Sequence, residues 1–549
     1  MLEKIKENPL DYKGYLEYGK YLENVNLKQA YLTYENALFY CHDELVKIEI
    51  QNKLDEITYR QGKVEPASIV ILSYNNRQLT QQCIESIRET TPESAREIVI
   101  VDNNSQDDSV AYLRQQDDIV LVENDFNAGF PGGCNIGIKA SKKENDIFLL
   151  NNDTILCANS LYTLRMGLYE KDNYGSAGSV TNNCANLQSV FKSDSIDELK
   201  EFGLKNNIVN KRNEIKLMLV AFAVLIKRHV LEKVGYLDER FFPGNFEDDD
   251  ISLRILKENY QNVLVYNSFI IHLGTVSFKK VDYSGILMKN YNKLVEKYNF
   301  QEDNGFYCFT HSETNVAFYL NQIKEIKKEN GKILVVKSDL GAAILHAAYL
   351  YPQFEFYGLN NTVSCATIST HLEGVNIEHY FDIENNPFKS IKFDFIVLDS
   401  TVIQKDEFEK YMIVLKNMMD DDGTMMIMTK NPSFYMNWYP ILKGETDAGL
   451  NKNVVYCNDV NDMLSKQNLN VKTWIFNYIE IPNEVREEIE AIQNVVGIQN
   501  HITVEIPENG CIEFWGDLEW TMEALINLIK NCMEHSKPGG VVHCGYSGN

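Results

Sequence analysis

A run of four acidic residues opens a predicted helix in FFPGNFEDDDISLRI, where Glu247, Asp248, Asp249 and Asp250 follow one another. Acidic side chains favour helix N-termini, so a first turn stabilised by the helix dipole would explain some of them. Four together exceed what capping needs. Their mutual repulsion would raise the pKa of at least one carboxyl group, which is what a general base requires.

Two further apolar segments end in residues that bind divalent cations. In LLNNDT, Asn151, Asn152 and Asp153 follow the apolar run, and hard oxygen ligands of this kind suit Mg²⁺ or Mn²⁺ bridging two phosphates. His272, in IIHLG, stands at the expected end of another strand and could complete a metal shell. A lone aspartate after a strand is also compatible with a simple turn.

Two other segments have features that suit a nucleotide. Asp102 follows the apolar run of IVIVDNNS, where a carboxylate can accept a hydrogen bond from a base N–H or a ribose hydroxyl, or can simply cap a turn. The glycines of NAGFPGGCNIGI, residues 127–138, let the backbone approach a ligand, and a helix there can direct its N-terminus at a diphosphate. The segment is neither a P-loop nor a dinucleotide fingerprint, because the spacing of both is absent.

Strands that alternate with helices are expected to position these residues. ASIVILSY, EIVIVDNNS, IVLVEND and DIFLLNNDT are typical of short buried strands, with a helix between the first two. This alternation predicts a mainly parallel sheet covered on both faces. Ligands of such sheets bind at the carboxyl ends of the strands, where the polar residues stand.

Composition bounds the class of protein. The chain has 549 residues, 44% of them hydrophobic and 24% charged, which is ordinary globular composition and predicts about three or four domains. Its net charge of −25 argues against nucleic acid and anionic membranes as partners. Eleven cysteines without metal or redox spacing indicate reduced thiols in a cytoplasmic protein. We expect no signal peptide and no transmembrane segment, and the oligomeric state stays open.

Changes in the pattern of apolar and polar residues divide the chain into five predicted regions. Residues 1–66 show helical spacing, and GKYLENVNLKQAYLTYENAL resembles one tetratricopeptide repeat; a helical hairpin packed on the next domain is the alternative reading. Residues 67–300 form the first α/β domain and 301–330 a helical linker. A second alternation predicts another α/β domain over 331–480, followed by a last part, 481–549.

The motifs, in their order along the chain, resemble those of the family 2 glycosyltransferases, and most closely their rhamnosyltransferase-like branch. The resemblance covers about residues 67–300 and is carried by SIVILSYNN, VDNNS, NAGFPGGCNIGI, LLNNDT, FEDDDISLR and HLG. It implies the nucleotide-sugar-binding GT-A fold. The fold class expected is therefore α/β: a GT-A domain with an N-terminal helical hairpin and a second, Rossmann-like α/β domain.

The resemblance also implies roles for single residues. Asp248 corresponds to the catalytic base, Asp153 to the metal-binding acid, and His272 to a histidine that binds the metal in some members. Asp102 would recognise a uracil-type base. The donor-binding positions are Ser73, Asn75, Asp102, Gly129, Gly133, Asn135, Asn152 and Glu247.

The sequence departs from the family pattern at three places. Cys134 stands where the branch often has asparagine, and Pro131 replaces a common alanine. LMLVAFAVLI, residues 217–226, lacks the glycine usual on that strand. The last departure predicts a different acceptor pocket, and none of the three removes a catalytic group.

The activity implied is inverting transfer, dependent on Mn²⁺ or Mg²⁺, from a UDP- or dTDP-sugar to a hydroxyl acceptor. UDP-GlcNAc is the donor we favour, with dTDP-rhamnose next, and the acceptor would be a surface glycan or a protein such as flagellin. Two other classes stay open: a non-catalytic scaffold with a decayed site, and a signalling module led by the C-terminal part.

The remaining α/β part resembles class I methyltransferases. Its loop KILVVKSDLGAAIL keeps only Gly341 of the glycines that approach the cofactor, which predicts a degenerate domain rather than S-adenosylmethionine binding. The last part resembles the start of a histidine-kinase ATP-binding domain, with Asn527 and Asn531 four apart on a helix and no DxGxG loop. A structural helix with incidental asparagines is the alternative there.

Overall fold

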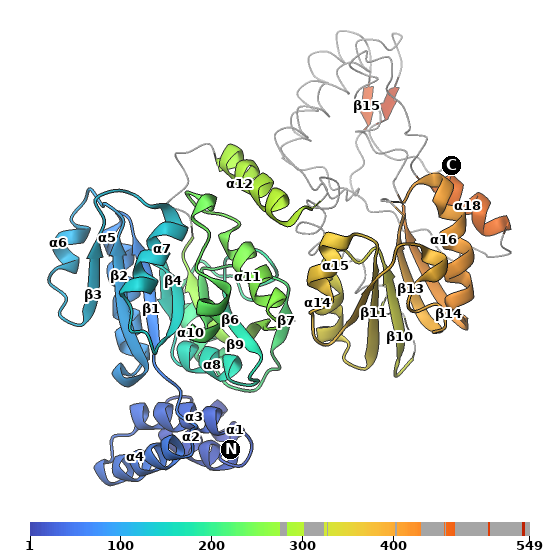
Figure 1. The fold of residues 1–549 in the computed structure, drawn as a ribbon. Helices are drawn as coiled ribbons and strands as arrows, with labels where there is room; N and C mark the ends of the chain where they lie inside the picture. The colour runs from blue at the N-terminus through green and yellow to red at the C-terminus, as the bar shows by residue number, and fades with distance from the viewer. Residues whose placement is uncertain are drawn as a thin grey trace. The chain divides into compact units, whose positions relative to one another are not determined.

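The computed structural model (Figure 1) describes residues 1–274, 283–300, 328–400 and 403–429, with the short stretches 323–324, 326, 455, 457–466, 503–505 and 541–543. Its contacts divide the chain into two units, 1–399 with 414–427, and 400–413 with 428–549. In the second unit the described elements include α18 (Cys457–Lys466) and the short parallel pair of β15 (Thr503–Glu505) and β16 (Val541–His543). Asn527 and Asn531 lie outside the described residues.

Four helices form the N-terminal segment: α1 (Leu2–Glu7), α2 (Tyr12–Leu22), α3 (Leu27–Tyr40) and α4 (Glu44–Tyr59). Asn26 precedes α3 and caps it, because its side chain accepts hydrogen bonds from the backbone of Lys28 and Gln29, each at 3.1 Å. The helices share one hydrophobic core with Tyr162 and Met166 of α8 (Ser160–Leu168).

A nine-stranded mixed sheet follows, in the order β3-β2-β1-β4-β8-β6-β9-β5, with β7 paired to β9. Strands β1, β2, β3 and β4 are parallel neighbours, as the alternating pattern predicts. The other half is mixed, because β8 runs antiparallel to both β4 and β6. The strands are β1 (Ala67–Ser73), β2 (Arg96–Asp102), β3 (Ile119–Glu123), β4 (Asp146–Asn151), β5 (Thr154–Leu156), β6 (Tyr174–Val180), β7 (Glu214–Lys216), β8 (Ala223–Ile226) and β9 (Gln261–His272).

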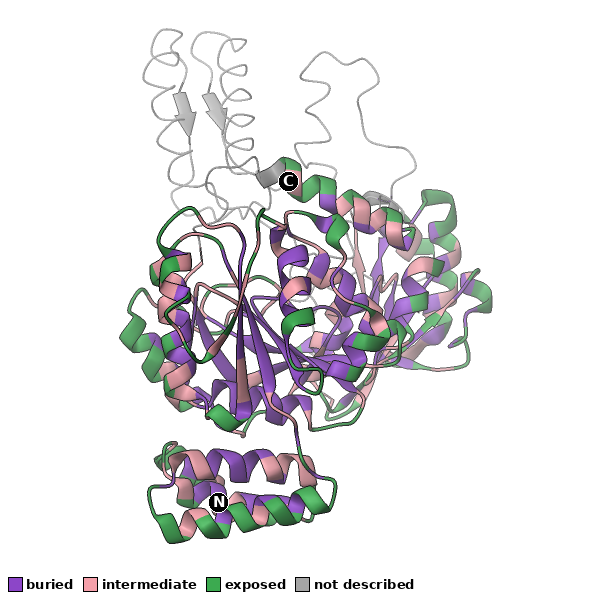
Figure 2. Ribbon diagram, turned by 60° about the vertical axis from the view of Figure 1, so that its left-hand side comes forward, coloured by how far each residue is buried: buried purple, intermediate pink, exposed green. Residues whose placement is uncertain are grey.

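Helices cover both faces of this sheet, as predicted from the alternation. Alternate residues of β1 show why: Ile69 and Ile71 belong to one buried cluster with α5, and Val70 belongs to a second cluster with α7. Figure 2 shows the buried strands under helices whose outer sides are exposed. The helices are α5 (Arg77–Thr90), η1 (Glu93–Ala95), α6 (Ser109–Leu113), α7 (Gly129–Ala140), α8, α9 (Ile196–Asn206), α10 (Arg228–Val234), η2 (Glu239–Phe241), α11 (Glu247–Lys257) and α12 (Tyr283–Tyr298).

A second sheet has the order β12-β11-β10-β13-β14. Its strands are β10 (Gly331–Val336), β11 (Phe354–Asn360), β12 (Asn376–His379), β13 (Phe393–Asp399) and β14 (Met419–Met428), with helices α14 (Ala342–Leu350), α15 (Val363–Ser369), η3 (Ile383–Asn385) and α16 (Lys405–Met418). Gly341 has φ +87°, and a Cβ there would lie 2.6 Å from the Ile377 side chain. The one glycine left in this loop is therefore required by close packing. The methyltransferase resemblance stays a prediction.

Candidate active site

The carboxyl ends of β1, β2 and β4 bring predicted site residues to one edge of the large sheet. Ser73 pairs with Asp102 across β1 and β2, and Leu72 pairs with Asn151 across β1 and β4. Thr80 of α5 connects two of the predicted donor ligands: its hydroxyl lies 3.2 Å from that of Ser73 and accepts a hydrogen bond of 3.0 Å from Asn152.

Asp102 is the buried acid of this edge, with 1% of its surface exposed. Its Oδ2 atom accepts a hydrogen bond of 2.9 Å from the backbone of Ser105, whereas its Oδ1 atom is buried without a partner among the described residues. Asn75 braces the same turn through the backbone N–H of Gln106, at 2.8 Å. A buried acceptor without a donor is costly, so Oδ1 of Asp102 suits a donor supplied by a ligand.

The first turn of α7 is held by a residue that the sequence analysis missed. Asn103 is 1% exposed, and its side chain bonds to Asn127, to the backbone N–H of Ala128 and to the carbonyl of Gly129. Gly129 itself has φ +70°, a region that favours glycine. The only sequence signal for Asn103 is its place after Asp102, at the end of β2.

Two residues predicted to line the donor pocket have other contacts in the structure. A Cβ on Gly133 would lie 2.2 Å from the side chain of Leu72, so this glycine lets α7 pack closely on β1. The amide of Asn135 is buried, donates to the carbonyl of Leu237 and to Glu239, and accepts from the N–H of Leu237. Both residues therefore support the pocket wall, and neither presents a free group to a ligand.

Asp153 and His272 lie together, as the two metal ligands are predicted to. The imidazole Nε2 atom is 3.3 Å from Oδ1 of Asp153, and both side chains are less than one fifth exposed, at 16% and 18%. Nδ1 of His272 lies 2.8 Å from the carbonyl oxygen of Asn183, so Nδ1 donates to that carbonyl and Nε2 faces Asp153 and the amide of Asn151, 3.5 Å away. Burial lowers the pKa of His272, but the hydrogen bond and charge of Asp153 outweigh it and raise the pKa overall.

Asp248 is the half-buried acid at the start of α11. Its Oδ2 atom accepts a hydrogen bond of 3.1 Å from the backbone N–H of Ala221, and its Oδ1 atom accepts one of 3.1 Å from that of Asp249. Burial raises the pKa of Asp248. Burial and the charge of Asp248 raise the pKa of Glu247 well above its usual range. The four acids are thus unequal in surroundings, as the sequence predicts of a site containing a base.

The segment directly before β8 connects the predicted base to the predicted metal-ligand pair. Ala221 holds Asp248, and the ring of the next residue, Phe222, stacks on His272 with centroids 5.1 Å apart. The carbonyl of Phe222 also accepts the N–H of Asn151, two residues before Asp153, at 2.9 Å. One short backbone segment, Ala221 and Phe222, therefore contacts both the predicted base and a predicted metal ligand.

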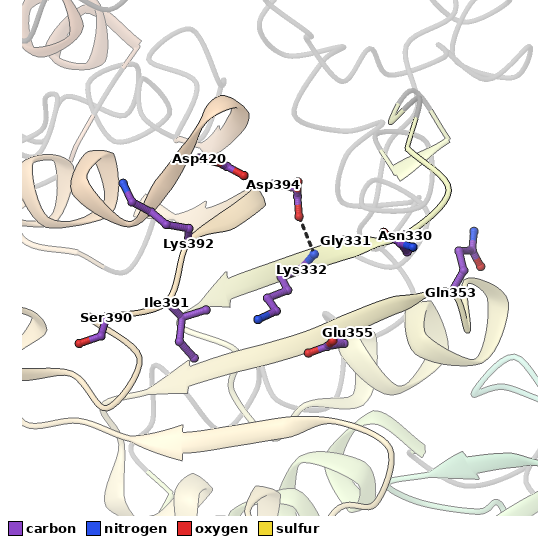
Figure 3. A pocket seen from close by; sticks show the side chains of 10 residues that line it. All are labelled: Asn330, Gly331, Lys332, Gln353, Glu355, Ser390, Ile391, Lys392, Asp394 and Asp420. Atoms are coloured by element: carbon purple, nitrogen blue, oxygen red, sulfur yellow. Dashed lines mark hydrogen bonds between the residues drawn. The ribbon is translucent and has the colours of Figure 1, made fainter.

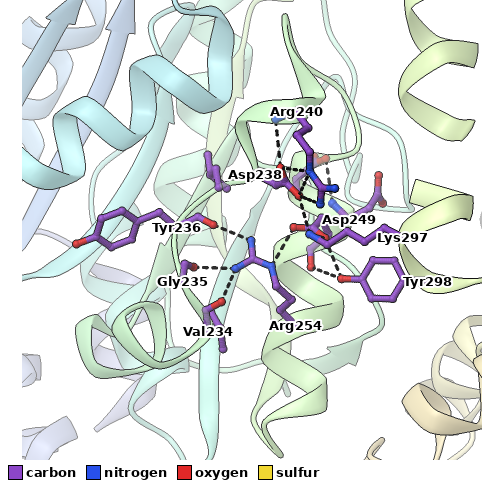
Figure 4. A network of polar contacts seen from close by, with 12 residues as sticks. Val234, Gly235, Tyr236, Asp238, Arg240, Asp249, Arg254, Lys297 and Tyr298 are labelled. Carbon is purple, nitrogen blue, oxygen red and sulfur yellow. Dashed lines mark hydrogen bonds and ion pairs between the residues drawn. The ribbon is translucent and has the colours of Figure 1, made fainter. Parts of the chain in front are cut away.

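Asp250, the last of the four acids, is fully buried and ion-paired. It contacts Arg254 at 2.9 Å and Lys297 at 2.5 Å. Figure 4 shows Arg254 donating to the carbonyl oxygens of Val234, Gly235 and Tyr236. The Asp250 carboxylate is therefore taken up by structural ion pairs and is not free. In the sequence, the only sign of these contacts is the four-residue spacing of Asp250 and Arg254.

Comparison with known proteins bears on the first α/β domain. Residues 68–235 match the model of glycosyl transferase family 2. The chain carries a family 2 glycosyl transferase domain. The predicted α/β fold of GT-A type is confirmed. The matched range holds Asp102, Gly129 and Asp153 but ends before Asp248 and His272, which the same sheet and its helices bring to the site.

The matches to curated relatives cover only part of this chain and part of each relative. The chain is 35% identical over 94 residues to a poly(ribitol-phosphate) beta-glucosyltransferase of Bacillus spizizenii, covering 16% of this chain and 15% of that one. It is 26% identical over 220 residues to the low-salt glycan biosynthesis hexosyltransferase Agl10 of Haloferax volcanii, covering 36% and 64%. The chain thus spans less than two thirds of each of these relatives.

Solved structures similar to the chain include two glycosyltransferases. GalNAc-T7 with UDP, GalNAc and Mn²⁺ has a TM-score of 0.37 and 15% identity, covering 45% of this chain and 50% of that one. The mannosyltransferase PcManGT of Pyrobaculum calidifontis, with GDP-Man and Mn²⁺, has a TM-score of 0.32 and 17% identity, covering 43% and 65%.

A second polar cluster lies far from the glycosyl transferase domain in sequence. A hollow of about 470 Å³ is lined by the starts of β10, β11 and β13 with Lys332, Lys392 and Asp394 (Figure 3). Asp394 and Asp422 share the ammonium group of Lys328, at 2.5 and 2.9 Å, so their charge is already paired. The hollow is at the amino ends of parallel strands, opposite the edge where open sheets bind ligands.

The described helices include none with both the length and the apolar surface to cross a bilayer.

Proposed function

We propose that the chain is a metal-dependent, inverting glycosyltransferase that moves a sugar from a nucleotide-sugar to a hydroxyl acceptor. The observation that carries the proposal is the link through Ala221 and Phe222, which joins the Asp248 carboxylate to the Asp153–His272 pair. A scaffold with a decayed site, the alternative, would not need to keep a base and two cation ligands in one place.

The donor end of the site would lie at Asp102. The imide N–H of uracil or thymine can supply the hydrogen bond that Oδ1 of Asp102 lacks, which favours a UDP- or dTDP-sugar. The names of the curated relatives, a glucosyltransferase and a hexosyltransferase, support transfer of a hexose. UDP-GlcNAc stays our preferred donor, with dTDP-rhamnose next.

Asp153 and His272 would hold Mn²⁺ or Mg²⁺. A carboxylate oxygen and an imidazole nitrogen facing one point fit such an ion, whose other ligands would be phosphate and water oxygens. A bound cation would stabilise the charge that develops on the leaving diphosphate. The backbone N–H groups at the start of α7, held by Asn103, would add to that stabilisation.

Asp248 would accept the proton of the attacking hydroxyl. The N–H of Ala221 holds the carboxylate in one orientation, and burial raises its pKa towards the range that a general base needs. With Asp248 as a base and no residue assigned as a covalent nucleophile, transfer would be one displacement that inverts the anomeric centre, as the family resemblance implies. The acceptor we propose is a hydroxyl on a surface glycan or on a protein such as flagellin.

A binding experiment tests the site. Thermal unfolding is followed with UDP, dTDP, GDP and ATP, each with and without Mn²⁺, for the wild-type chain and for Asp153→Ala. A ligand at 100 times its Kd adds about 2.7 kcal/mol to the free energy of unfolding. We expect a Mn²⁺-dependent shift with UDP or dTDP that Asp153→Ala loses. A shift with ATP alone, or none, would contradict the proposal.

A further inference from the structure

Helix α12 holds the backbone that leads to Asp248, the proposed general base. Asn290 of α12 is fully buried, and its amide nitrogen donates to the carbonyl oxygens of Phe241 and Gly244, each at 2.8 Å. An amide nitrogen has two hydrogens to donate, so two short bonds use both of them. Asn290 therefore fixes the path of residues 241–244, directly before α11.

The carboxyl end of α12 holds the first turn of α11. The Lys297 ammonium group lies 2.5 Å from Asp250 and 2.8 Å from Asp238. The Tyr298 hydroxyl donates to Oδ1 of Asp250 at 2.9 Å. Asp250 is fully buried, so loss of the lysine would leave part of a buried charge uncompensated. These contacts are made two residues beyond Asp248.

The segment 234–246 is thereby held along its whole length. Arg254 of α11 binds the carbonyl oxygens at its start (Figure 4), Asn135 of α7 binds Leu237, and Asn290 of α12 binds its end. The same segment touches the start of α7, where the N–H of Phe130 donates to the carbonyl of Pro243 at 2.7 Å. Segment 234–246 therefore connects the N-terminus of α7, where the diphosphate would lie, to Asp248, where the acceptor would lie.

We propose that α12 is a positioning helix, and that Asn290 and Lys297 set the placement of the Asp248 carboxylate relative to the N-terminus of α7. This inference rests on the function proposed above. Neither residue touches the site itself, and both lie beyond the range that matches the family model. Misplacement of a reacting group by about 1 Å can cost about 100-fold in rate, so small shifts of this segment would matter.

The test uses the full chain with four variants. Asn290→Leu removes the two donors at similar size, Lys297→Met removes the charge, and Lys297→Arg keeps it. Lys289→Met is the control, because Lys289 is exposed on the same helix. Two readouts are taken: kcat and donor KM for Mn²⁺-dependent turnover of UDP-GlcNAc, and hydrogen exchange of the backbone amides of 241–250.

We expect Asn290→Leu and Lys297→Met to lower kcat by about tenfold or more with donor KM nearly unchanged. Exchange should rise in 241–250 and not across the domain, and Lys297→Arg should recover most of the loss. Variants that match Lys289→Met in both readouts would overturn the inference, as would exchange that rises uniformly with a fall in Tm. If the wild-type chain turns over no nucleotide-sugar, the proposed function fails, and local exchange alone then decides whether α12 holds the segment.

Discussion

The Nε2 atom of His272 lies 3.3 Å from the Oδ1 atom of Asp153. Asp153 stands directly before β5 and His272 ends β9, and these strands are antiparallel neighbours in which Thr154 pairs with His272. Asn183 binds the other imidazole nitrogen, and Phe222 stacks on the ring, so the histidine has one orientation. A carboxylate oxygen and an imidazole nitrogen therefore lie close together at the edge of the sheet, as the proposed cation site requires.

Removing either member of this pair should weaken cation dependence. Asp153→Ala is expected to lower the rate of nucleotide-sugar turnover at a fixed Mn²⁺ concentration by about 100-fold. His272→Ala should raise the Mn²⁺ concentration needed for half-maximal rate by about tenfold or more. Mn²⁺ titrations of the rate measure both effects. Unchanged titration curves for both variants would show that the cation, if used, binds elsewhere.

The rate of sugar transfer should decrease as the pH is lowered below neutrality. Burial raises the pKa of Asp248, and a general base acts in its deprotonated form, so the rate should increase as the pH rises through this raised value. The midpoint of this limb should lie above the ordinary aspartate pKa of about 3.9. A pH profile of kcat measures it. An acid limb that persists in Asp248→Asn would assign the titration to another group.

Glu247→Gln should stabilise the fold. Glu247 is 5% exposed, and its Oε2 atom has no partner among the described residues. Its pKa is raised in the folded chain, so its contribution to stability is present at acidic pH and is lost as the pH rises through that value. The glutamine variant should therefore gain about 1 kcal/mol near neutral pH, less at acidic pH, and should lose activity if Glu247 binds the donor. Denaturant unfolding at two pH values tests this; equal gains at both would contradict it.

Gly133→Ala distinguishes packing from ligand contact. A Cβ at this position would lie 2.2 Å from Leu72, whereas one at Gly132 would lie 3.1 Å from its nearest neighbour, Ala128. We expect Gly133→Ala to cost about 1–3 kcal/mol through overpacking and Gly132→Ala to cost less. Thermal unfolding of both variants is the measurement. If Gly133→Ala had normal stability but a raised donor KM, Gly133 would line the donor pocket as the sequence predicts.

The features that could be predicted from the sequence are those that depend on the periodicity of apolar residues and on the residues at strand ends. The parallel strands β1 to β4 and the placement of Asp102, Asp153 and His272 follow from apolar runs that end in polar residues. The roles of Gly133 and Asn135 did not follow, because they depend on how α7 lies on β1 and on residues about a hundred positions away.

The contacts around Asp250 were hidden for the same reason. Four adjacent acids look alike in sequence, but Lys297 and Tyr298 reach only Asp250 among them in the described structure, whereas Asp248 is bound by Ala221. Which acid is free depends on a helix far along the chain. The antiparallel pairing of β8 with β4 was likewise not predictable, because an apolar run in the sequence carries no information on the direction in which its neighbouring strand runs.

Release of UDP from UDP-GlcNAc, and of dTDP from dTDP-rhamnose, by the purified full chain with Mn²⁺ tests the central claim most directly. It is measured for the wild-type chain, for Asp248→Asn and for the exposed control Lys289→Met. The account predicts release by the wild type and the control, dependent on Mn²⁺, and a loss of about 100-fold or more in Asp248→Asn. Release that is equal in all three chains, or absent from the wild type with both donors, would contradict it.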